Sequence, residues 1–445
     1  MTARELTGST ARALERRITE RRATVGVIGL GYVGLPLAVG FAQAGFPVVG
    51  FETDRTRAAS LARGVSYVED VPDGALGPLV LRGRLTSTRE FGALAATDVA
   101  VICVQTPVTA AHEPDLAFVA SALREVARGL HAGQLVVLQS TTYPGTTEEI
   151  ALPALAQSGL RVGEDFFLAF SPERIDPGNR RHTTRTIPRV VGGITPVCTA
   201  LTQRLFEQLE TPVYPVSSAR AAEMTKLLEN VFRSVNIALV NEFARLCEPL
   251  GIDVWEVVGA AATKPFGFMP FDPGPGVGGH CIAVDPYHLA WKAAACGVPA
   301  RLTALAAEIN EAMPSYVADR VTQAVATHRR APIAGARILG LGASYKGDVG
   351  DTRESPAVKV LSLLKQRGAL IAYHDAHVPR VWIDGTEYTS VALTPSEIGG
   401  ADCVVVLTAH GDIDYRQVAE HAQLVFDTRH AVPPGAPSHG TILRL

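Results

Sequence analysis

The chain has 445 residues, with 41 basic and 44 acidic side chains and a formal net charge of −3. This length is typical of about three domains. The near-balance of charge argues against a dedicated nucleic-acid binder, which would show a clustered basic excess. Apolar residues make up 47% and charged residues 19% of the chain, so we expect a folded protein with a sizeable core.

No apolar run reaches the roughly 18 residues that a membrane helix needs, so we expect no membrane partner. The first 22 residues are rich in arginine, but they contain Glu5, Glu15 and Glu20 and no apolar core. Secretory signals need such a core, and transit peptides are poor in acids. The sequence therefore predicts a cytoplasmic protein.

The six cysteines form no C-x-x-C pair, which argues against a metal knuckle or a disulfide scaffold. They stand at positions 103, 198, 247, 281, 296 and 403. We expect them to be core residues, except that one could act as a nucleophile. Only six of the 41 cations are lysines, so a lysine indicates a place where the chain prefers an ammonium group.

The predicted elements start with alternating strands and helices. Strands are expected over 24–30, 48–51, 98–104 and 135–139. Helices from 31 to 44 and over 118–129 connect them. This alternation is typical of a parallel, doubly wound sheet.

A long helix is predicted over 219–250, because its apolar residues have helical spacing and no proline occurs before Pro249. The helical pattern continues from 286 to about 328, with a break at 297–299. Strand and helix patterns then return over 335–341, 355–367, 369–374 and 402–407. The expected fold class is α/β, with a Rossmann-like N-terminal domain, a central helical region and a Rossmann-like C-terminal domain.

A glycine-rich turn, Gly29-Leu-Gly31-Tyr-Val-Gly34, follows the first strand and opens the first helix. Glycines in this pattern allow a tight turn, close approach to a pyrophosphate and close helix packing, and the helix N-terminus attracts the anion. Glu52 follows the second strand, where an acid accepts hydrogen bonds from a ribose and favours NAD over NADP. Arg57 complicates this preference, because it could pair with a 2′-phosphate. A turn without a cofactor is the alternative.

A second cluster is the glycine-dense loop over 271–279, which leads to Cys281 and Asp285-Pro286. Such a loop lets backbone crowd a ligand, and a helix N-terminus lowers the pKa of a thiol from about 8.5. This pattern makes Cys281 a candidate nucleophile. The alternatives are a cysteine that packs in the core and an ordinary helix start, with Asp at the N-cap and Pro at the first helical position.

The long helix carries a polar stripe. Lys226 and Asn230 are four residues apart on one face, and Asn241 returns to that face about three turns later. For Glu223 and Asn241 a structural role is favoured over a chemical one. The opposite face, which we expect to pack, consists of Leu228, Val231, Val235 and Leu239.

Two further loops, over 139–146 and 170–174, follow predicted strands. The first carries hydroxyl groups, and the second carries Glu173 and Arg174. Open α/β sheets bind ligands outside the carboxyl ends of their strands, so both loops are candidate ligand sites.

Together these residues resemble the nucleotide-sugar 6-dehydrogenases, the family of UDP-glucose and UDP-N-acetylhexosamine dehydrogenases. The resemblance runs from Thr24 to the last strand and rests on the motifs GLGYVGLP, CVQTP, STTYPGTT, SPER, EMTKLLEN, PGPGVGGHC and YKGD…TRESP. It implies an NAD-binding domain over 23–215, a central helical domain over 216–328 and a nucleotide-sugar-binding domain over 329–445. It also implies a homodimer, or a larger homo-oligomer, formed through the central helices.

The resemblance implies an NAD-dependent, four-electron oxidation of a sugar C6 alcohol to a carboxylate. In this scheme the Cys281 thiolate adds to an aldehyde and the adduct is oxidised to a thioester. Water activated by Glu173 or Asp285, with Thr141 nearby, hydrolyses the thioester. The catalytic residues implied are Cys281, Lys226, Asn230, Asp285, Glu173 and Thr141.

In the same scheme Lys226 and Asn230 stabilise the oxyanion and hold a water or sugar oxygen. The cofactor-binding residues implied are Gly29, Gly31, Tyr32, Val33, Gly34, Glu52, Arg57, Thr106 and Thr141. The substrate-binding residues implied are Glu173, Arg174, Lys226, Asn230, Phe271, Gly274, Gly278, Lys346 and Arg353. For Lys346 and Arg353 an interdomain salt bridge is the alternative.

The run KPFGFMPF from Lys264 and the Gly-Gly-His-Cys sequence are most similar to the UDP-N-acetylglucosamine branch, because the UDP-glucose branch usually has Ser before the cysteine. Asp272, Ala283 and Gly347 depart from that branch, where Tyr, Pro and Lys are common. Asp272 and Gly347 remove or reverse positive charge near the expected sugar nucleotide. UDP-glucose and UDP-N-acetylmannosamine remain the alternative substrates.

Three other interpretations stay open. A two-electron hydroxyacid dehydrogenase would share the fold plan, need no cysteine and give one NADH per substrate. A catalytically silent NAD-binding scaffold is disfavoured by the complete set of candidate catalytic residues. A metal site at His374, Asp375 and His377 is disfavoured by a simpler polar strand-end loop, so we expect no metal and no effect of chelators.

Overall fold

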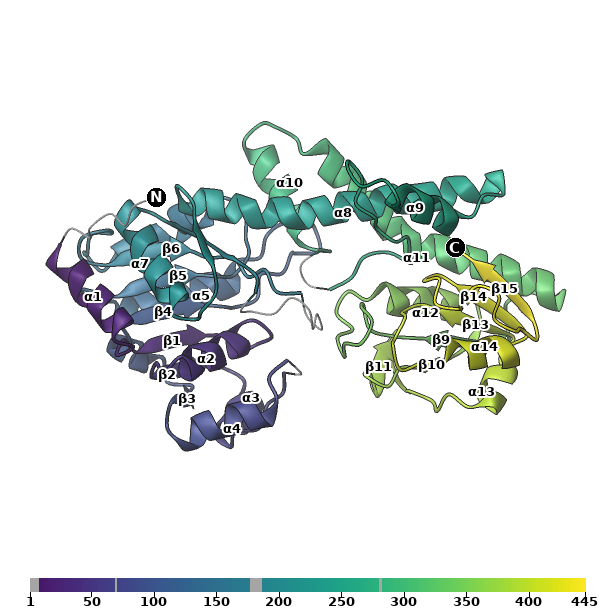
Figure 1. Cartoon of the computed structure of the whole chain (residues 1–445), viewed down its shortest axis with the longest axis horizontal. Helices are drawn as coiled ribbons and strands as arrows, with labels where there is room; N and C mark the ends of the chain where they lie inside the picture. The colour runs from purple at the N-terminus through teal and green to yellow at the C-terminus, as the bar shows by residue number, and fades with distance from the viewer. Residues whose placement is uncertain (1–7, 69, 177–185, 280–281) are drawn as a thin grey trace. The chain divides into compact units, whose positions relative to one another are not determined.

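The protein is described by a computed structural model that covers residues 8–68, 70–176, 186–279 and 282–445 (Figure 1). The chain forms two compact units. The N-terminal unit comprises Met1–Glu229 and Tyr287–Val298, and the C-terminal unit comprises Asn230–Pro286 and Pro299–Leu445. No helix in the described ranges is long and apolar enough to cross a bilayer.

The N-terminal unit is built on an eight-stranded sheet in the order β3-β2-β1-β4-β5-β6-β7-β8. Its strands are β1 (Val25–Ile28), β2 (Val48–Phe51), β3 (Leu85–Thr88), β4 (Val99–Ile102), β5 (Leu135–Leu138), β6 (Phe167–Phe170), β7 (Arg189–Gly193) and β8 (Val213–Pro215). Neighbouring strands are parallel except for β6 and β7. Because β1 lies between β2 and β4, the strand order reverses beside β1, and open sheets bind ligands at such a point.

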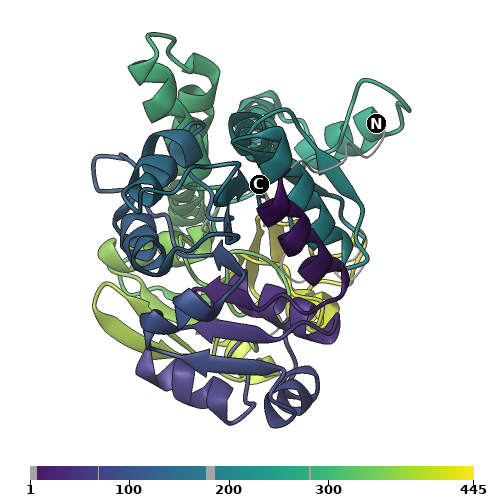
Figure 2. The ribbon, with the colours of Figure 1, turned by 90° about the vertical axis from the view of Figure 1, so that its left-hand side faces the viewer.

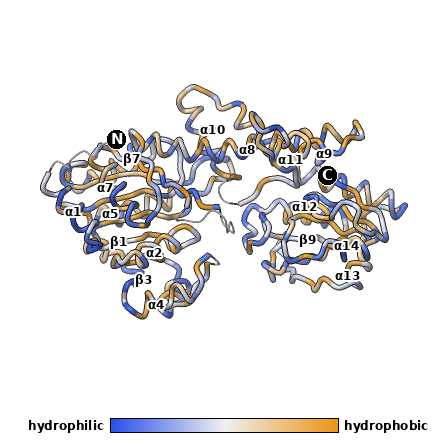
Figure 3. The backbone as a smooth tube through the Cα atoms, in the orientation of Figure 1, coloured by the Kyte–Doolittle hydropathy of each residue, from blue (hydrophilic) through white to orange (hydrophobic). Residues whose placement is uncertain are grey.

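Helices cover both faces of this sheet, which explains the uninterrupted apolar sequences of its central strands. One face carries α1 (Ser9–Thr19), α2 (Gly34–Gln43), α4 (Asp73–Leu81) and α7 (Pro196–Glu207), and the other carries η1 (Phe91–Ala96), α5 (Ala117–Gly129) and α6 (Leu152–Ala156). Val25 and Val27 of β1 enter the first core, whereas Ile28 enters the second. Strand β1 and helix α2 are correspondingly drawn as hydrophobic in Figure 3.

Helix α1 was not predicted, because its charged sequence was interpreted as a polar lead-in. Ala11, Leu14 and Ile18 are nevertheless spaced three and four residues apart and are fully buried. They pack in the same core as α7, and α1 is the purple helix of Figure 2. An ion pair of 2.7 Å between Arg17 and Asp98 adds to this contact.

The C-terminal unit contains a five-stranded parallel sheet in the order β10-β9-β13-β14-β15. Its strands are β9 (Arg337–Leu341), β10 (Leu370–His374), β13 (Cys403–Val406), β14 (Leu424–Asp427) and β15 (Thr441–Arg444). Helices α11 (Arg301–Arg329) and α12 (Pro356–Gln366) cover one face, and α13 (Pro395–Gly399) and α14 (Tyr415–His421) cover the other. The α/β fold class is therefore confirmed, with a second doubly wound sheet.

The remaining elements are helical, apart from one short hairpin. Helix α8 (Ala219–Leu250) belongs to the N-terminal unit up to Glu229 and to the C-terminal unit beyond it. The helical prediction over 286–328 is confirmed by α10 (Asp285–Ala295) and α11, with the expected break between them. The other elements are α3 (Arg55–Ala62), η2 (Thr147–Ala151), α9 (Val254–Ala262), β11 (Arg380–Ile383) and β12 (Thr386–Thr389).

The prediction that Leu228, Val231, Val235 and Leu239 form a buried face of α8 is wrong. Leu228 is 65% exposed, Leu239 is 48% exposed, and Val231 and Val235 are only half-buried. The buried face is instead the polar one, made of Glu223, Lys226, Asn230, Ser234 and Asn241. Loops supply most of these polar groups with partners, whereas the apolar face stays uncovered by the described residues.

Candidate active site

The glycine-rich turn lies at the carboxyl end of β1. Gly29 has a φ of 87°, in the left-handed region, and a Cβ there would lie 2.8 Å from the carbonyl oxygen of Cys103. A Cβ on Gly34 would collide with the Gly29 carbonyl, whereas the space around Gly31 is open. Gly29 therefore fits a tight turn, Gly34 fits close helix packing, and Gly31 fits close approach to a phosphate. The turn therefore fits the pyrophosphate of a dinucleotide.

Glu52, directly after β2, is a buried acid with 6% exposure, and its Oε1 accepts the backbone N–H of Asp54 at 3.0 Å. The Tyr67 hydroxyl donates to the Leu30 carbonyl at 2.7 Å, and burial together with the charge of Glu52 raises the pKa of Tyr67. The Arg57 guanidinium lies over the Tyr67 ring, 5.2 Å from its centroid. Arg57 is thus engaged with an aromatic ring, and the buried anion at the strand end is Glu52.

The other predicted cofactor residues lie near this edge of the sheet. Thr106, beyond β4, is buried, and its carbonyl oxygen is 3.2 Å from Nε2 of His288 in α10. Thr141 is half-buried in the loop after β5, next to Ser140, whose hydroxyl donates to the Val104 carbonyl at 2.8 Å. Tyr32 and Val33 lie in the glycine turn, so the structure places these residues at the carboxyl ends of β1, β4 and β5.

Glu173, in the loop after β6, is held by several donors. Its Oε1 accepts the backbone N–H groups of Arg174 and Ile175 at 2.8 and 2.9 Å, and its Oε2 accepts Nε2 of Gln139 at 2.8 Å. The Cys103 thiol is 3.7 Å from Oε1 of Gln139. Burial, and then the charge of Glu173, raise the pKa of Cys103, so this thiol stays protonated and fits a packing role.

The Arg174 side chain is fully engaged within the N-terminal unit. Its Nε and Nη2 form a fork with the two carboxylate oxygens of Glu229 at 3.1 and 2.7 Å, and its Nη1 donates to the Pro188 carbonyl at 2.6 Å. Such a bidentate pair fixes geometry as well as charge. Arg174 therefore braces the Glu173 loop against α8.

The buried face of α8 begins with Glu223. Its carboxylate accepts the backbone N–H groups of Gly145 and Thr147 at 2.5 and 2.9 Å and the Thr147 hydroxyl at 2.6 Å. Burial raises the pKa of Glu223 despite these bonds. This is the structural role that the sequence favoured.

Lys226 follows one helical turn later and is 7% exposed. Its Nζ forms no hydrogen bond or ion pair with another described residue. A buried charge is costly unless it is paired, so an ammonium in this environment indicates a functional site and not a stabilising contact.

In the C-terminal unit, Nδ2 of Asn230 donates a short hydrogen bond to Oδ2 of Asp285, and both side chains are buried. Asn241 accepts the backbone N–H of Gly274 at 2.9 Å through Oδ1 and donates to Oδ1 of Asn310 at 3.0 Å. Asn230 and Asp285 are thus brought together as expected, and Asn241 has the structural role that was favoured. Cys281 and His280 lie outside the described residues.

The glycines of the loop over 271–279 contact protein groups. A Cβ on Gly278 would lie 2.7 Å from Cβ of Tyr345, and Gly279, at a φ of 78°, donates its N–H to the Arg353 carbonyl at 3.0 Å. Phe271 packs edge-on against Phe232, with ring centroids 5.8 Å apart. These glycines are required because the segment around Tyr345 approaches the loop closely, a reason that the sequence did not indicate.

Arg429 is a half-buried cation beside this loop, and the sequence analysis did not identify it. Its Nε donates to the Leu407 carbonyl at 2.9 Å, and its Nη1 would be 2.5 Å from a Cβ on Gly274. Burial lowers the pKa of Arg429 to about 10, while Asp272 and Asp427 act in the opposite direction. Asp272 is therefore partly compensated by Arg429 and does not simply add negative charge, as the sequence argument assumed.

Lys346 and Arg353 lie in the segment after β9. The Arg353 guanidinium forms a fork with Asp351, with Nε–Oδ1 and Nη2–Oδ2 distances of 3.0 and 2.6 Å. This is a local pair between residues two positions apart. The carbonyl of Lys346 accepts the Ser344 hydroxyl at 2.8 Å.

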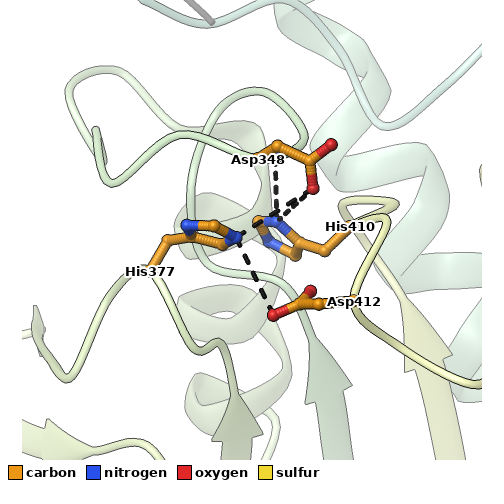
Figure 4. Close-up of side chains that lie close together, drawn as sticks. All are labelled: Asp348, His377, His410 and Asp412. Atoms are coloured by element: carbon orange, nitrogen blue, oxygen red, sulfur yellow. Dashed lines mark hydrogen bonds and ion pairs between the residues drawn. The ribbon is translucent and has the colours of Figure 1, made fainter. Parts of the chain in front are cut away.

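Four ligand-type side chains, Asp348, His377, His410 and Asp412, converge in the loops of the C-terminal sheet (Figure 4). Nε2 of His377 is 4.0 Å from Oδ1 of Asp348 and 3.9 Å from Oδ2 of Asp412. Nε2 of His410 lies 3.1 Å from Asp375, and its Nδ1 accepts the backbone N–H of Asp348 at 3.0 Å. Both nitrogens of His410 are thus already engaged, which disfavours this ring as a metal ligand.

Asp375 anchors the same loops. Burial alone would raise the pKa of Asp375, but hydrogen bonds from His410 and from the N–H groups of Ala343 and Ser344 lower it to about 2. His374 lies 2.7 Å from the Val391 carbonyl through its Nδ1. These contacts support the polar strand-end loop that was expected here, and the absence of a metal remains a prediction.

Three family models match the chain. All three are described as the UDP-glucose/GDP-mannose dehydrogenase family, with the NAD binding domain over residues 23–210, the central domain over 220–312 and the UDP binding domain over 339–434. The NAD binding match contains the glycine turn and Glu52, which fit a dinucleotide on structural grounds.

Individual relatives cover nearly the whole chain. The chain is 34% identical to UDP-N-acetyl-D-glucosamine 6-dehydrogenase of Pseudomonas aeruginosa, over 91% of this chain and 96% of the relative. It is 35% identical to an NDP-N-acetyl-D-galactosaminuronic acid dehydrogenase of Ralstonia nicotianae, over 94% and 98%. The solved structure of a UDP-D-ManNAc dehydrogenase from Pyrococcus horikoshii superposes with a TM-score of 0.85 and 32% identity, over 95% and 98%. The chain therefore belongs to the UDP-glucose/GDP-mannose dehydrogenase family and is an NAD-dependent nucleotide-sugar dehydrogenase.

Proposed function

We propose that this enzyme oxidises the C6 alcohol of a nucleotide sugar to the carboxylate in two successive steps, and that UDP-N-acetylglucosamine is the favoured substrate. The observation that carries the proposal is the largely buried side chain of Lys226, whose ammonium has no partner among the described residues, one helical turn from the Asn230–Asp285 hydrogen bond. An oxidation at an alcohol carbon generates negative charge on oxygen, and a preorganised cation stabilises it.

Lys226 and Asn230 are proposed to act on that oxygen. As the alcohol proton passes to solvent water, negative charge develops on O6, and the ammonium lowers the energy of this state without having to reorganise. Departure of the hydride then leaves the neutral aldehyde. Asp285 holds the Asn230 amide, which fixes the direction of its second N–H. Bound NAD supplies the hydride acceptor.

Cys281 is proposed as the nucleophile of the second oxidation. Its sulfur bonds to the aldehyde carbon, and loss of a hydride from the adduct gives a thioester. Water then adds to the thioester carbon, the carbon–sulfur bond breaks, and the carboxylate and free thiol are released. Glu173 or Asp285 is proposed to accept the proton of this water, with Thr141 nearby.

Binding roles are proposed for the other residues that the family resemblance implies. The glycine turn, Tyr32, Val33, Glu52 and Thr106 are proposed to hold NAD. Phe271, Gly274, Gly278, Lys346 and Arg353 are proposed to hold the nucleotide sugar. The division into an NAD-binding domain over 23–215, a central domain over 216–328 and a sugar-nucleotide domain over 329–445 is part of the same proposal.

The sugar is proposed from the KPFGFMPF run and from the names of the relatives, which are dehydrogenases of N-acetylated hexosamines. These names divide between gluco, manno and galacto sugars. UDP-N-acetylmannosamine and UDP-glucose are therefore the alternative substrates.

The cofactor assignment predicts a preference for NAD over NADP, because the Glu52 carboxylate would repel a 2′-phosphate. Glu52→Ala should raise the KM for NAD about tenfold and reduce the preference for NAD over NADP. Initial rates with both cofactors at varied concentration measure this. Equal use of both cofactors by the unmodified enzyme would refute the assignment.

The reaction predicts two NADH for each sugar acid formed. A panel of UDP-N-acetylglucosamine, UDP-N-acetylmannosamine and UDP-glucose, read by absorbance and by mass spectrometry of the product, identifies the sugar and the ratio. Efficient oxidation of UDP-glucose alone would overturn the proposed sugar but leave the reaction intact. One NADH per product would overturn the reaction.

Two cysteine variants test the ratio of two NADH per sugar acid, one at the proposed nucleophile and one as its control. Cys281→Ala should lose sugar-acid formation but keep NAD binding, because the first hydride transfer needs no thiol. Cys403→Ala, in the buried strand β13, should keep two NADH per acid. Rapid two-NADH turnover by Cys281→Ala would exclude the covalent route.

The exposed face of α8 supports a homodimer. Its apolar side chains with substantial exposure are Met224, Leu228, Phe232, Leu239, Phe243, Leu246 and Leu250. Such a contiguous apolar surface is uncommon on a monomer and typical of an interface. We propose that a second copy of the chain covers it.

The dimer proposal predicts that Phe243→Glu with Leu246→Glu lowers the molecular mass measured by light scattering from two chains or more to one, because two charges would be buried at the contact. Leu81→Glu, at a fully exposed apolar position of α4, is the matched control and should leave the mass unchanged. An unmodified protein that is monomeric at micromolar concentration would contradict the proposal.

A further inference from the structure

The carboxylate of Glu173 has one acceptor position that its hydrogen bonds leave open. A carboxylate offers about four lone-pair sites. Two on Oε1 take the backbone N–H groups of Arg174 and Ile175, and one on Oε2 takes Gln139. The remaining site is on Oε2, and the nearest cation to that oxygen among the described residues is Arg189.

Arg189 is the first residue of β7, the strand that runs antiparallel to β6. Its Nη1 lies 3.5 Å from Oε2 of Glu173, and its side chain is 6% exposed. Its Cζ is 5.0 Å from the centroid of the Phe206 ring. Glu173 is the one carboxylate among the described residues that pairs with Arg189.

The contact between these groups is an ion pair without a hydrogen bond. Both Nε and Nη1 of Arg189 are buried and have no hydrogen-bond acceptor among the described residues. Burying a guanidinium with unfilled N–H groups is destabilising, and an apolar side chain of similar volume is often as stable. Fold stability therefore does not explain an arginine at this position.

We propose that Arg189 is a positioning residue for Glu173, supplying a counter-charge that holds Oε2 while its last lone pair stays open to water. The side-chain amide of Gln139 also donates to Oε2, which restricts rotation of the carboxylate. At 3.5 Å from Oε2, Nη1 is close enough to attract the carboxylate by its charge but too far for a direct hydrogen bond, so it does not fill the last acceptor position. This inference rests on the proposed role of Glu173 in thioester hydrolysis.

The step that Arg189 serves is a hydrolysis and needs no oxidant. The water oxygen bonds to the thioester carbon, one water proton passes to Glu173 and then to solvent, and the carbon–sulfur bond breaks. The sulfur leaves as the Cys281 thiolate. The two hydride transfers that precede this step should be unaffected by Arg189.

Arg189→Met should slow thioester hydrolysis about tenfold or more, because general-base assistance typically contributes about 10²–10⁴-fold and the variant weakens it without removing Glu173. Rapid mixing of enzyme, NAD and UDP-N-acetylglucosamine should give a burst of two NADH per site, followed by slow turnover. Intact-protein mass spectrometry should show the sugar acyl group on the enzyme during that slow phase. A merely structural defect would lower the burst and leave no acyl group.

Four further variants complete the test. Arg189→Lys keeps the charge and should restore most of the hydrolysis rate. Glu173→Gln should accumulate the same acyl-enzyme, and adding Arg189→Met to it should cause no further loss, because Arg189 acts through Glu173. Arg128→Met, which removes an exposed ion pair with Glu125 on α5, is the matched control.

The outcomes separate the inference from the proposed function. Normal hydrolysis by Arg189→Met beside slow hydrolysis by Glu173→Gln would overturn the inference and leave Glu173 as the base. A further tenfold loss in the double variant would also overturn it, since the two residues would then act independently. Normal hydrolysis by Glu173→Gln would overturn the role of Glu173 itself and point to Asp285.

Discussion

The structure depends on burying the polar face of one long helix. Five polar side chains of α8 are turned inward, and a buried polar group is costly unless it finds a partner. The partners are loops: Glu223 binds the turn at Gly145, and Asn241 binds the glycine loop at Gly274. Glu223 thus fixes the position of one loop in the N-terminal unit, and Asn241 fixes the position of another in the C-terminal unit.

Lys226 is the exception on this face. Its neighbours Glu223 and Asn230 have hydrogen-bond partners, whereas Lys226 is largely buried and its ammonium forms no hydrogen bond or ion pair with the residues that the structure describes. A folded protein tolerates such a group when a ligand completes its environment. A negative charge that develops on a substrate oxygen is the complement that a dehydrogenase supplies, and this gives the rarity of lysine in the chain a physical reason.

The parts of the fold that could be predicted had a strong periodic signal. Helix α8, the glycine turn and the strands β1, β2, β4, β5, β9, β10 and β13 were found where the apolar spacing and the glycines placed them, whereas the buried strands β7 and β14 were not predicted. Helix α1 was missed because three apolar residues stood among many charges. The apolar stripe on α8 was identified but assigned to the wrong environment, since its pattern does not distinguish a core from an uncovered surface.

The candidate site was less predictable, because its contacts join residues that are far apart in the chain. The pairing of Asn230 with Asp285 followed from no spacing rule, although both residues had been selected. Arg189 and Arg429 carried no local motif, and only their positions beside Glu173 and the glycine loop reveal them. The sequence predicted that the glycine loop lets backbone crowd a ligand, and the structure adds the close approach of Tyr345 to Gly278 and Gly279, which no spacing rule indicated.

The central claim is that the ammonium of Lys226 stabilises negative charge on the sugar oxygen. The most direct measurement is the rate of the first hydride transfer in a single turnover. With enzyme in excess over the nucleotide sugar, Lys226→Ala should slow that transfer about 100-fold or more, the loss typical of one oxyanion donor, while the Kd for NAD stays unchanged. Lys359→Ala, at an exposed ion pair with Glu354, should keep the normal rate. A normal first hydride transfer in Lys226→Ala would contradict the account.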